Sequence, residues 1–285
     1  MFKFREYGKI IDGSYQGDLM RKPAVADRFY PGSPDELKKT ISNLLKGAER
    51  NRKKAFAAVS PHAGYIYSGE LAAETLGSIV IPETAIMIGP NHRGAGAPAA
   101  LSTCPWELPS GVVPINEKLA QDILHYSSNI TCDERAHKLE HSIEVQIPFL
   151  QYQQKDLSIV PLIVSHISYP LCIEIAEALV DAIKAFKKEV LIVASTDMSH
   201  YEPRHIATEK DAQALQHIKN INPEKLYFTV FDHKISMCGV IPVTITLIAA
   251  KMMGASTCEL IGYTDSGYAS GDIEQVVGYA GLTIS

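Results

Sequence analysis

The sequence predicts a single α/β domain with a central, mostly parallel sheet flanked by helices. Short, almost continuously apolar runs alternate along the chain with longer segments whose apolar residues recur at helical spacing. Such runs are typical of strands that are buried on both faces of a sheet. The sequence contains no internal repeat, low-complexity stretch or linker. We therefore expect residues 21–285 to form one domain, preceded by an extension over residues 1–20.

The expected strands are the apolar runs, and each is too short to be a buried helix. The run AFAAVS, for example, ends at Ser60-Pro61-His62, where the apolar pattern stops. We expect strands at residues 55–60, 84–90, 157–165, 189–197, 258–267 and 275–284.

The expected helices follow from apolar spacing and from end signals. Ser33 and Pro34 predict a helix start, because serine caps helices and proline suits the first helical position; Glu36 would complete a capping box. That helix should end near Leu45. Pro148 should strain the helix that spans it, because proline lacks the amide hydrogen. We expect the other helices at residues 69–79, 116–127, 141–153, 169–186, 205–220 and 240–254.

Composition excludes several classes of function. The formal net charge of −5 argues against a broad attraction to nucleic acid or to an anionic membrane. The first residues lack the apolar core of a signal peptide, and no run of about 18 apolar residues could span a bilayer. The five cysteines are widely spaced and form no CxxC pair, so neither a disulfide framework nor a zinc ribbon is indicated. We expect a cytoplasmic protein with no nucleic-acid or membrane partner.

Three of the predicted strands have a histidine just after their carboxyl end. His62 follows the first, His92 follows the second, and His200 follows a third together with Asp197. Ligands of open α/β sheets bind at this edge of the sheet. If the strands are parallel neighbours, these histidines converge on one crevice. A single histidine after a strand is more often a hydrogen-bonding loop residue, so the shared placement carries the hypothesis.

A second group of polar residues lies at the start of the segment 141–153 and just before it. His137 and His141 are four residues apart, so on a helix they would face the same side, and Glu140 and Glu144 form a similar pair. The pattern fits a metal cradle, although the HExxH signature is absent. An exposed charged helix face explains it equally well. His141 is the stronger candidate because it opens directly into the amphipathic segment.

Cys238 is the informative cysteine. It precedes a helix with Pro242 in its first turn, and a helix N-terminus lowers a thiol pKa and favours the thiolate. The thiolate is the form that binds metal or attacks an electrophile. The alternative is that Cys238 is a small buried hydrophobe, which is also the interpretation for Cys172 and Cys258.

Taken together, the motifs resemble the Memo-like family, also called the AmmeMemoRadiSam system protein B family. They occur in one order along almost the whole chain, and their combination is specific. The matching pieces are residues 21–33 (RKPAVADRFYPGS), 60–69 (SPHAGYIYSG), 88–92 (IGPNH), 140–146 (EHSIEVQ), 195–200 (STDMSH), 237–239 (MCG) and 277–281 (VGYAG).

The resemblance implies a fold similar to that of the class III extradiol dioxygenases. It also implies a metal site of two histidines and a cysteine, which match His62, His92 and Cys238. Asp197 and His200 match a nearby acid and an acid/base histidine. His141 matches a further histidine of the site.

The cysteine distinguishes this pattern from the dioxygenases, which hold iron with two histidines and a carboxylate. A thiolate is a softer ligand that favours copper or thiolate-tolerant iron, with zinc as an alternative, and it makes the site oxidisable. Ring cleavage is therefore not expected. Family resemblance also implies radical-SAM and AMMECR1-like proteins as partners.

Three hypotheses of function remain open from the sequence. The first is a metal-dependent oxidoreductase that acts on an unidentified small molecule, with His200, Asp197 and His141 in catalytic roles. The second is a non-catalytic binding module that uses the same pocket for a peptide or a small anion. The third and weakest is a thiol nucleophile at Cys238.

Overall fold

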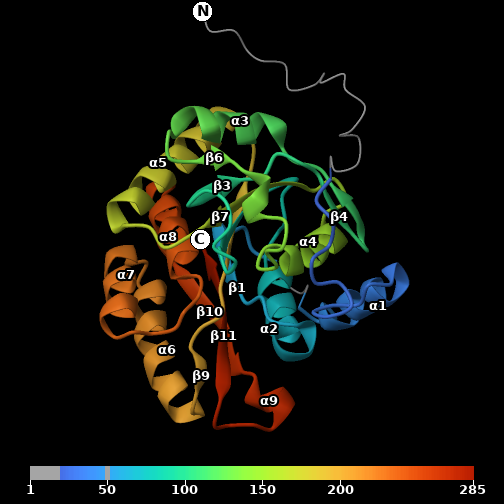
Figure 1. Ribbon diagram of the computed structural model, residues 1–285, viewed down its shortest axis with the longest axis vertical. Coiled ribbons are helices and arrows are strands. Elements are labelled where there is room, and N and C mark those ends of the chain that lie inside the picture. The colour runs from blue at the N-terminus through green and yellow to red at the C-terminus, as the bar shows by residue number, and fades with distance from the viewer. Residues whose placement is uncertain (1–19, 49–51) are drawn as a thin grey trace, which may run out of the picture.

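The computed structural model describes residues 20–48 and 52–285, which form one α/β domain (Figure 1). The predicted extension over residues 1–20 lies, apart from Met20, outside the described residues. The strands of the main sheet are β1 (Ala57–Ser60), β2 (Thr84–Pro90), β3 (Ala99–Leu101), β6 (Thr131–Cys132), β7 (Ser158–Val164), β8 (Leu191–Ser195), β9 (His200–Glu202), β10 (Cys258–Asp265) and β11 (Val276–Ile284).

The centre of the sheet is parallel, as the sequence predicts. The strand order is β10-β11-β1-β8-β2-β7-β3-β6, and β1, β8, β2 and β7 run parallel to their neighbours in this row. β11 joins β1 in the antiparallel direction and also pairs with β10 and β9, while β3 is antiparallel to β7. The sheet is therefore mixed, with antiparallel pairs towards both edges. Every residue of β1, β2 and β8 is buried, which explains why these strands read as uninterrupted apolar runs.

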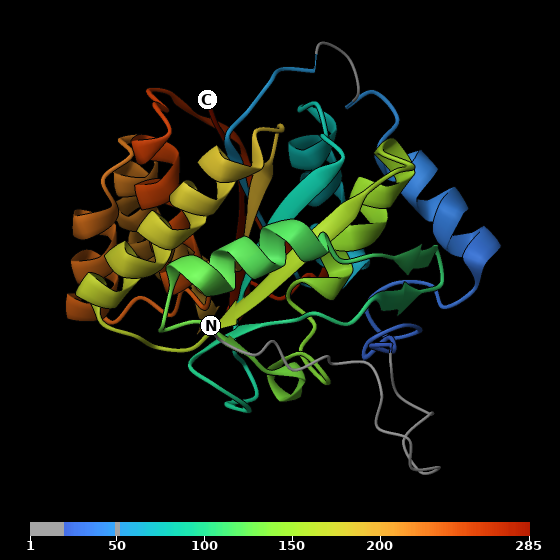
Figure 2. The ribbon, with the colours of Figure 1, turned by 90° about the horizontal axis from the view of Figure 1, so that it is seen from above.

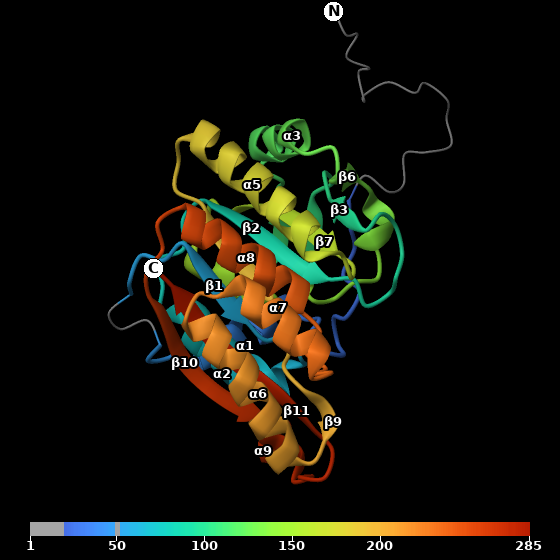
Figure 3. The same ribbon diagram turned by 90° about the vertical axis from the view of Figure 1, so that its left-hand side faces the viewer.

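Helices cover both faces of the sheet (Figure 2). Figure 3 looks onto the face covered by α5, α6, α7 and α8, whereas α1, α2 and α4 lie on the opposite face. No described helix is both long and apolar enough to span a membrane. The helices are α1 (Pro34–Leu44), α2 (Tyr65–Gly77), α3 (Glu117–Tyr126), α4 (Ile147–Gln153), α5 (Tyr169–Phe186), α6 (Arg204–Lys219), α7 (Pro223–Asp232), α8 (Val240–Met252) and the short α9 (Gly267–Ser270).

Several short elements escape sequence-based prediction. The strands β3, β6 and β9 have only two or three residues each, as do β4 (Trp106–Leu108) and β5 (Gly111–Val113), which pair with each other. Runs of this length carry no periodic signal. Helix α7 was also missed, although Asn222 caps it and Pro223 occupies its first turn.

Two predictions about helix starts are wrong in detail. The segment 141–153 is not one helix: η2 (Glu144–Gln146) is a 3-10 turn, and α4 begins after it with Pro148 in its first turn. Proline there starts the helix instead of straining it, because the first amides of a helix need no intrahelical acceptor. At α1, Ser33 has the backbone conformation of a cap but its side chain makes no capping hydrogen bond.

Candidate metal centre

The candidate site lies where three neighbouring parallel strands end. β1, β8 and β2 are adjacent in that order, and their carboxyl ends lead into His62, Asp197 and His92. The structure brings His62 and His92 together, with ring centroids 5.1 Å apart. This is the edge at which ligands bind in open α/β sheets.

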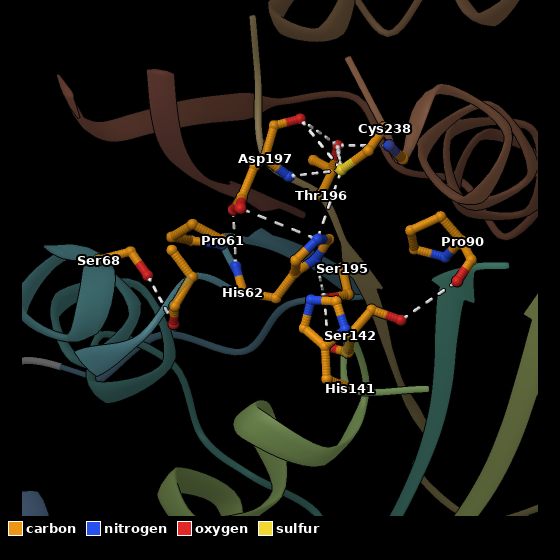
Figure 4. Close-up of polar contacts among 12 residues, drawn as sticks. Pro61, His62, Ser68, Pro90, His141, Ser142, Ser195, Thr196, Asp197 and Cys238 are labelled. Carbon is orange, nitrogen blue, oxygen red and sulfur yellow. Dashed lines mark hydrogen bonds and ion pairs between the residues drawn. The ribbon is translucent and has the colours of Figure 1, made fainter. Parts of the chain in front are cut away.

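His141 completes a cluster of three imidazoles. One ring nitrogen from each of His62, His92 and His141 lies within 4.8 Å of the others. The His141 ring stacks on His92 at a centroid distance of 4.7 Å and meets His62 edge-on at 5.4 Å. In Figure 4, His62 lies between His141 on one side and Cys238 with Asp197 on the other. His141 follows no strand, so the strand-end pattern alone could not place it.

Hydrogen bonds fix the protonation of the His62 ring. Its Nδ1 lies 2.8 Å from the Ser195 hydroxyl, which donates its own hydrogen to the Ser142 carbonyl at 2.6 Å. The hydroxyl must then accept from His62, so Nδ1 carries the proton and Nε2 keeps its lone pair. An Nε2 lone pair held in this way is suited to bind a metal ion.

Glu140 orients the ring of His92, as Ser195 orients that of His62. The carboxylate accepts from His92 Nδ1 at 2.9 Å and from the His92 amide at 2.8 Å. It also accepts from the amides of His141 and Ser142, each at 2.9 Å. A carboxylate bonded to the far nitrogen of a histidine is a common support of metal-binding imidazoles, because it fixes the ring and raises its basicity.

Electrostatics keep the His62 and His141 rings neutral and the Glu140 carboxylate ionised. Burial opposes ionisation of Glu140, but the hydrogen bond and charge of His92, together with His141, outweigh it and lower the Glu140 pKa to about 2. Burial, followed by repulsion from His62, lowers the pKa of His141 to about 4. Burial and His92 hold the His62 pKa well below its usual value. Neutral imidazole is the form that binds metal.

Cys238 lies beside His62 but outside the group of three imidazoles whose ring nitrogens are within 4.8 Å of one another, so His141 takes the place in that group that was expected for the cysteine. Its sulfur lies 3.4 Å from His62 Nε2 and accepts a hydrogen bond from the Asp197 amide at 3.2 Å (Figure 4). Gly239 permits this approach, since a Cβ there would lie 2.4 Å from the Thr196 Cβ. Burial and the Asp197 charge raise the pKa of the Cys238 thiol, opposite to the expectation from the helix N-terminus alone. Cys172 is fully buried, in agreement with its interpretation as a small hydrophobe.

Asp197 and His200 lie beside the cluster but are not bonded to each other. The Asp197 carboxylate accepts from the His62 amide at 2.8 Å, and burial raises its pKa. His200 is held instead by Ser236, whose carbonyl accepts from His200 Nδ1 at 2.9 Å and whose hydroxyl accepts from the His200 amide at 2.7 Å. A carbonyl only accepts, so Nε2 of His200 is free to take up a proton.

The predicted pairing of His137 with His141 is wrong. The two residues do not share a helix, and His137 is fully buried with its Nε2 at 3.0 Å from the Ala100 carbonyl. The exposed charged face proposed for Glu140 and Glu144 is also wrong, because both carboxylates are buried. Sequence reasoning missed the supporting roles of Glu140 and Ser195, although both lie inside motifs that carried the family resemblance.

Comparison with known proteins agrees with these motifs. The model of the Memo-like protein family matches residues 21–283. The chain belongs to the Memo-like family. A MEMO1 family protein of Aquifex aeolicus is 42% identical over 266 residues, covering 92% of this chain and 98% of that protein. A MEMO1 family protein of Methanosarcina barkeri is 37% identical over 266 residues, covering 93% and 100% of the two chains.

A solved structure supports the fold. The crystal structure of an uncharacterized protein from Escherichia coli K12 matches with a TM-score of 0.55, covering 80% of this chain and 98% of that one. The two sequences are 13% identical, so the likeness concerns the fold alone. The expected Memo-like α/β fold is thereby confirmed.

The donor set fits a transition metal ion. Three imidazoles suit copper, iron or zinc better than magnesium or calcium, which prefer oxygen ligands. The Nδ1 atom of His141 is buried and has no hydrogen-bond partner among the described residues. This nitrogen lies 3.4 Å from Glu140 Oε1, so the carboxylate that orients His92 also faces His141.

Proposed function

We propose that this Memo-like protein is a metal-dependent oxidoreductase that acts on a small molecule. One copper or iron ion is held by His62, His92 and Cys238, with His141 beside them. The convergence of three imidazoles, two of them oriented through Nδ1, carries the proposal. When bound, copper or iron supplies one-electron oxidation and reduction.

The protein's own residues position and deprotonate the substrate. Ser195 and Glu140 aim the Nε2 atoms of His62 and His92 into the site. His200 accepts a substrate proton at Nε2, because Ser236 holds its other nitrogen in the protonated form. Buried Asp197 fixes the backbone at His62 and stabilises positive charge that develops on the histidines.

Elemental analysis of purified protein tests the proposal. We expect near-stoichiometric copper or iron in the wild type and its loss in both His62→Ala and His92→Ala. His200→Ala should keep the metal. Surface substitution His125→Ala is the matched control, because His125 is exposed on α3.

Paired variants decide the third ligand. Loss of the metal in Cys238→Ser but not in His141→Asn supports the thiolate as ligand. The reverse pattern would assign the third position to His141. Metal retained in both His62→Ala and His92→Ala, or no copper or iron bound after anaerobic loading, would contradict the proposal and favour the binding-module hypothesis.

A further inference from the structure

Cys238 borders a cavity that is lined by residues from the end of α7, the start of α8 and the segment between them. Figure 3 shows these two helices on one face of the sheet. The cavity has a volume of about 360 Å³, within the size range of small-molecule sites. The Cys238 sulfur lies 3.4 Å from His62 Nε2, so the cavity shares Cys238 with the candidate metal centre. Its apolar wall is formed by Val230, Phe231, Ile235, Met237 and Val240.

Phe231 gives this wall an aromatic surface that is held in place. Its ring packs against Tyr227 at a centroid distance of 4.6 Å and meets the ring of His166 edge-on at 5.9 Å. His166 also lines the cavity. Phe231 remains 39% exposed, so part of the ring is available to a ligand.

Lys234 is an exposed lysine among the residues that line the cavity. No acidic residue lines this cavity, and Lys234 forms no ion pair with any of residues 20–48 and 52–285. A lysine ammonium beside an apolar wall, without a carboxylate of the protein to neutralise it, is a site for an anionic group of a ligand.

Two hydrogen bonds hold the backbone at Lys234 in a fixed conformation. The amide of Lys234 donates to the Phe231 carbonyl at 3.2 Å, and the Ile235 amide donates to the Val230 carbonyl at 2.9 Å. These bonds form a Schellman turn that ends α7, with Lys234 in the left-handed conformation at a φ of 52°. Glycine is the usual residue at that position, because it has no Cβ. Replacing this lysine by glycine therefore removes the charge while favouring the turn.

We propose that the cavity binds an organic acid made of an apolar, aromatic or aliphatic, body and one carboxylate. The body packs on Phe231 and its apolar neighbours, and the carboxylate pairs with Lys234. That this acid is the substrate of the metal centre rests on the proposed function, whereas the binding itself does not.

Titration calorimetry with two matched probes tests the proposal on the full-length, metal-loaded protein. The probes are 3-phenylpropionate and its neutral amide, 3-phenylpropionamide. We expect the wild type to bind the acid about tenfold more tightly than the amide, the size of one charge-assisted hydrogen bond. Lys234→Gly should bind the acid no more tightly than the wild type binds the amide. Lys187→Gly is its control, because Lys187 ends α5 in the same left-handed conformation and does not line the cavity.

A second pair of variants tests the apolar wall. Phe231→Ala should weaken binding of both probes by the same factor. Phe228→Ala is the control, since Phe228 is 47% exposed on the same helix and does not line the cavity.

Three results would overturn the proposal. They are no binding of the acid at millimolar concentration, equal affinity for acid and amide, and unchanged acid binding in Lys234→Gly. Elemental analysis of the same samples tests the metal separately. If the acid binds to protein that holds no copper or iron, the proposal for the cavity stands and the proposed oxidoreductase function fails.

Discussion

Glu140 and Glu144 are both fully buried carboxylates, four residues apart, yet different groups neutralise their charges. Glu144 binds Arg21 and the Tyr30 hydroxyl, and it accepts from the amides of Ala24 and Val25 at 2.8 and 3.1 Å. It thereby clamps the segment 21–30 against η2.

Glu140, in contrast, has imidazoles and backbone amides as partners. His92 donates to it through both its ring and its amide, and His141 lies beside it. An arginine stays charged at every relevant pH, so the Glu144 clamp is permanently neutralised and serves stability. A neutral imidazole brings no counter-charge, so the charge of Glu140 would be available to a metal ion held at Nε2 of His92. The two equally buried glutamates thus have different roles: Glu144 stabilises the fold, and Glu140 supports the imidazole cluster.

The largest expected effect is on the clamp. Glu144→Gln leaves the Arg21 guanidinium buried without its counter-charge, which should lower the free energy of unfolding by about 3–5 kcal/mol. Urea denaturation measures this loss. Glu259→Gln breaks an exposed pair with Lys53 and should cost less than about 1 kcal/mol. Equal losses in the two variants would contradict the structural role of Glu144.

The clamp should also be sensitive to acid through His137, whose carbonyl accepts from Arg21 at 3.1 Å. Burial lowers the pKa of His137 to about 4. The unfolded chain then binds a proton that the folded one rejects, so stability is full above pH 6.5 and falls as the pH drops to 4.

The expected loss from His137 is up to about 3 kcal/mol, from a pKa difference of about 2.5 units. Urea denaturation across this pH range should show a flatter profile for His137→Gln than for wild type. His125→Gln, on an exposed histidine, should leave the profile unchanged. A wild-type stability that is constant from pH 6.5 to 4 would refute this prediction.

Glu140→Gln should act on metal affinity more than on folding. The amide keeps the shape of the side chain but loses the charge that supports His92, so affinity should fall about 10–100-fold. Competition with a chromophoric chelator measures the dissociation constant. If Glu144→Gln, measured while folded, lost as much affinity as Glu140→Gln, the contrast between the two glutamates would fail.

Ser195→Ala should give the smallest effect. It removes a neutral acceptor from His62 Nδ1, and a neutral hydrogen bond contributes about 0.5–1.5 kcal/mol, so metal affinity should fall less than about tenfold. The same chelator competition compares it with Glu140→Gln. A larger loss in Ser195→Ala would show that the hydroxyl, and not the carboxylate, governs the orientation of the cluster.

Sequence reasoning located much of the site because strand ends are visible as breaks in apolar runs. His62, His92 and Asp197 were placed by that pattern, and the parallel order of β1, β8 and β2 brings them together. Cys238 was singled out by its place before α8. The segment from His137 to Glu144 was misinterpreted, because two histidines and two glutamates at helical spacing look like a solvated helix face.

By itself, the sequence determined the alternation of buried strands and helices, and so the α/β fold and the edge of the sheet where ligands bind. Those features depend on local apolar periodicity, which is written in neighbouring residues. Only the tertiary structure decided that His141, and not Cys238, shares the group of closely spaced ligand atoms with His62 and His92, that Ser236 holds His200, and that Lys234 lines a cavity bordered by Cys238. These contacts join residues far apart in the chain, and their energies depend on burial and on distance.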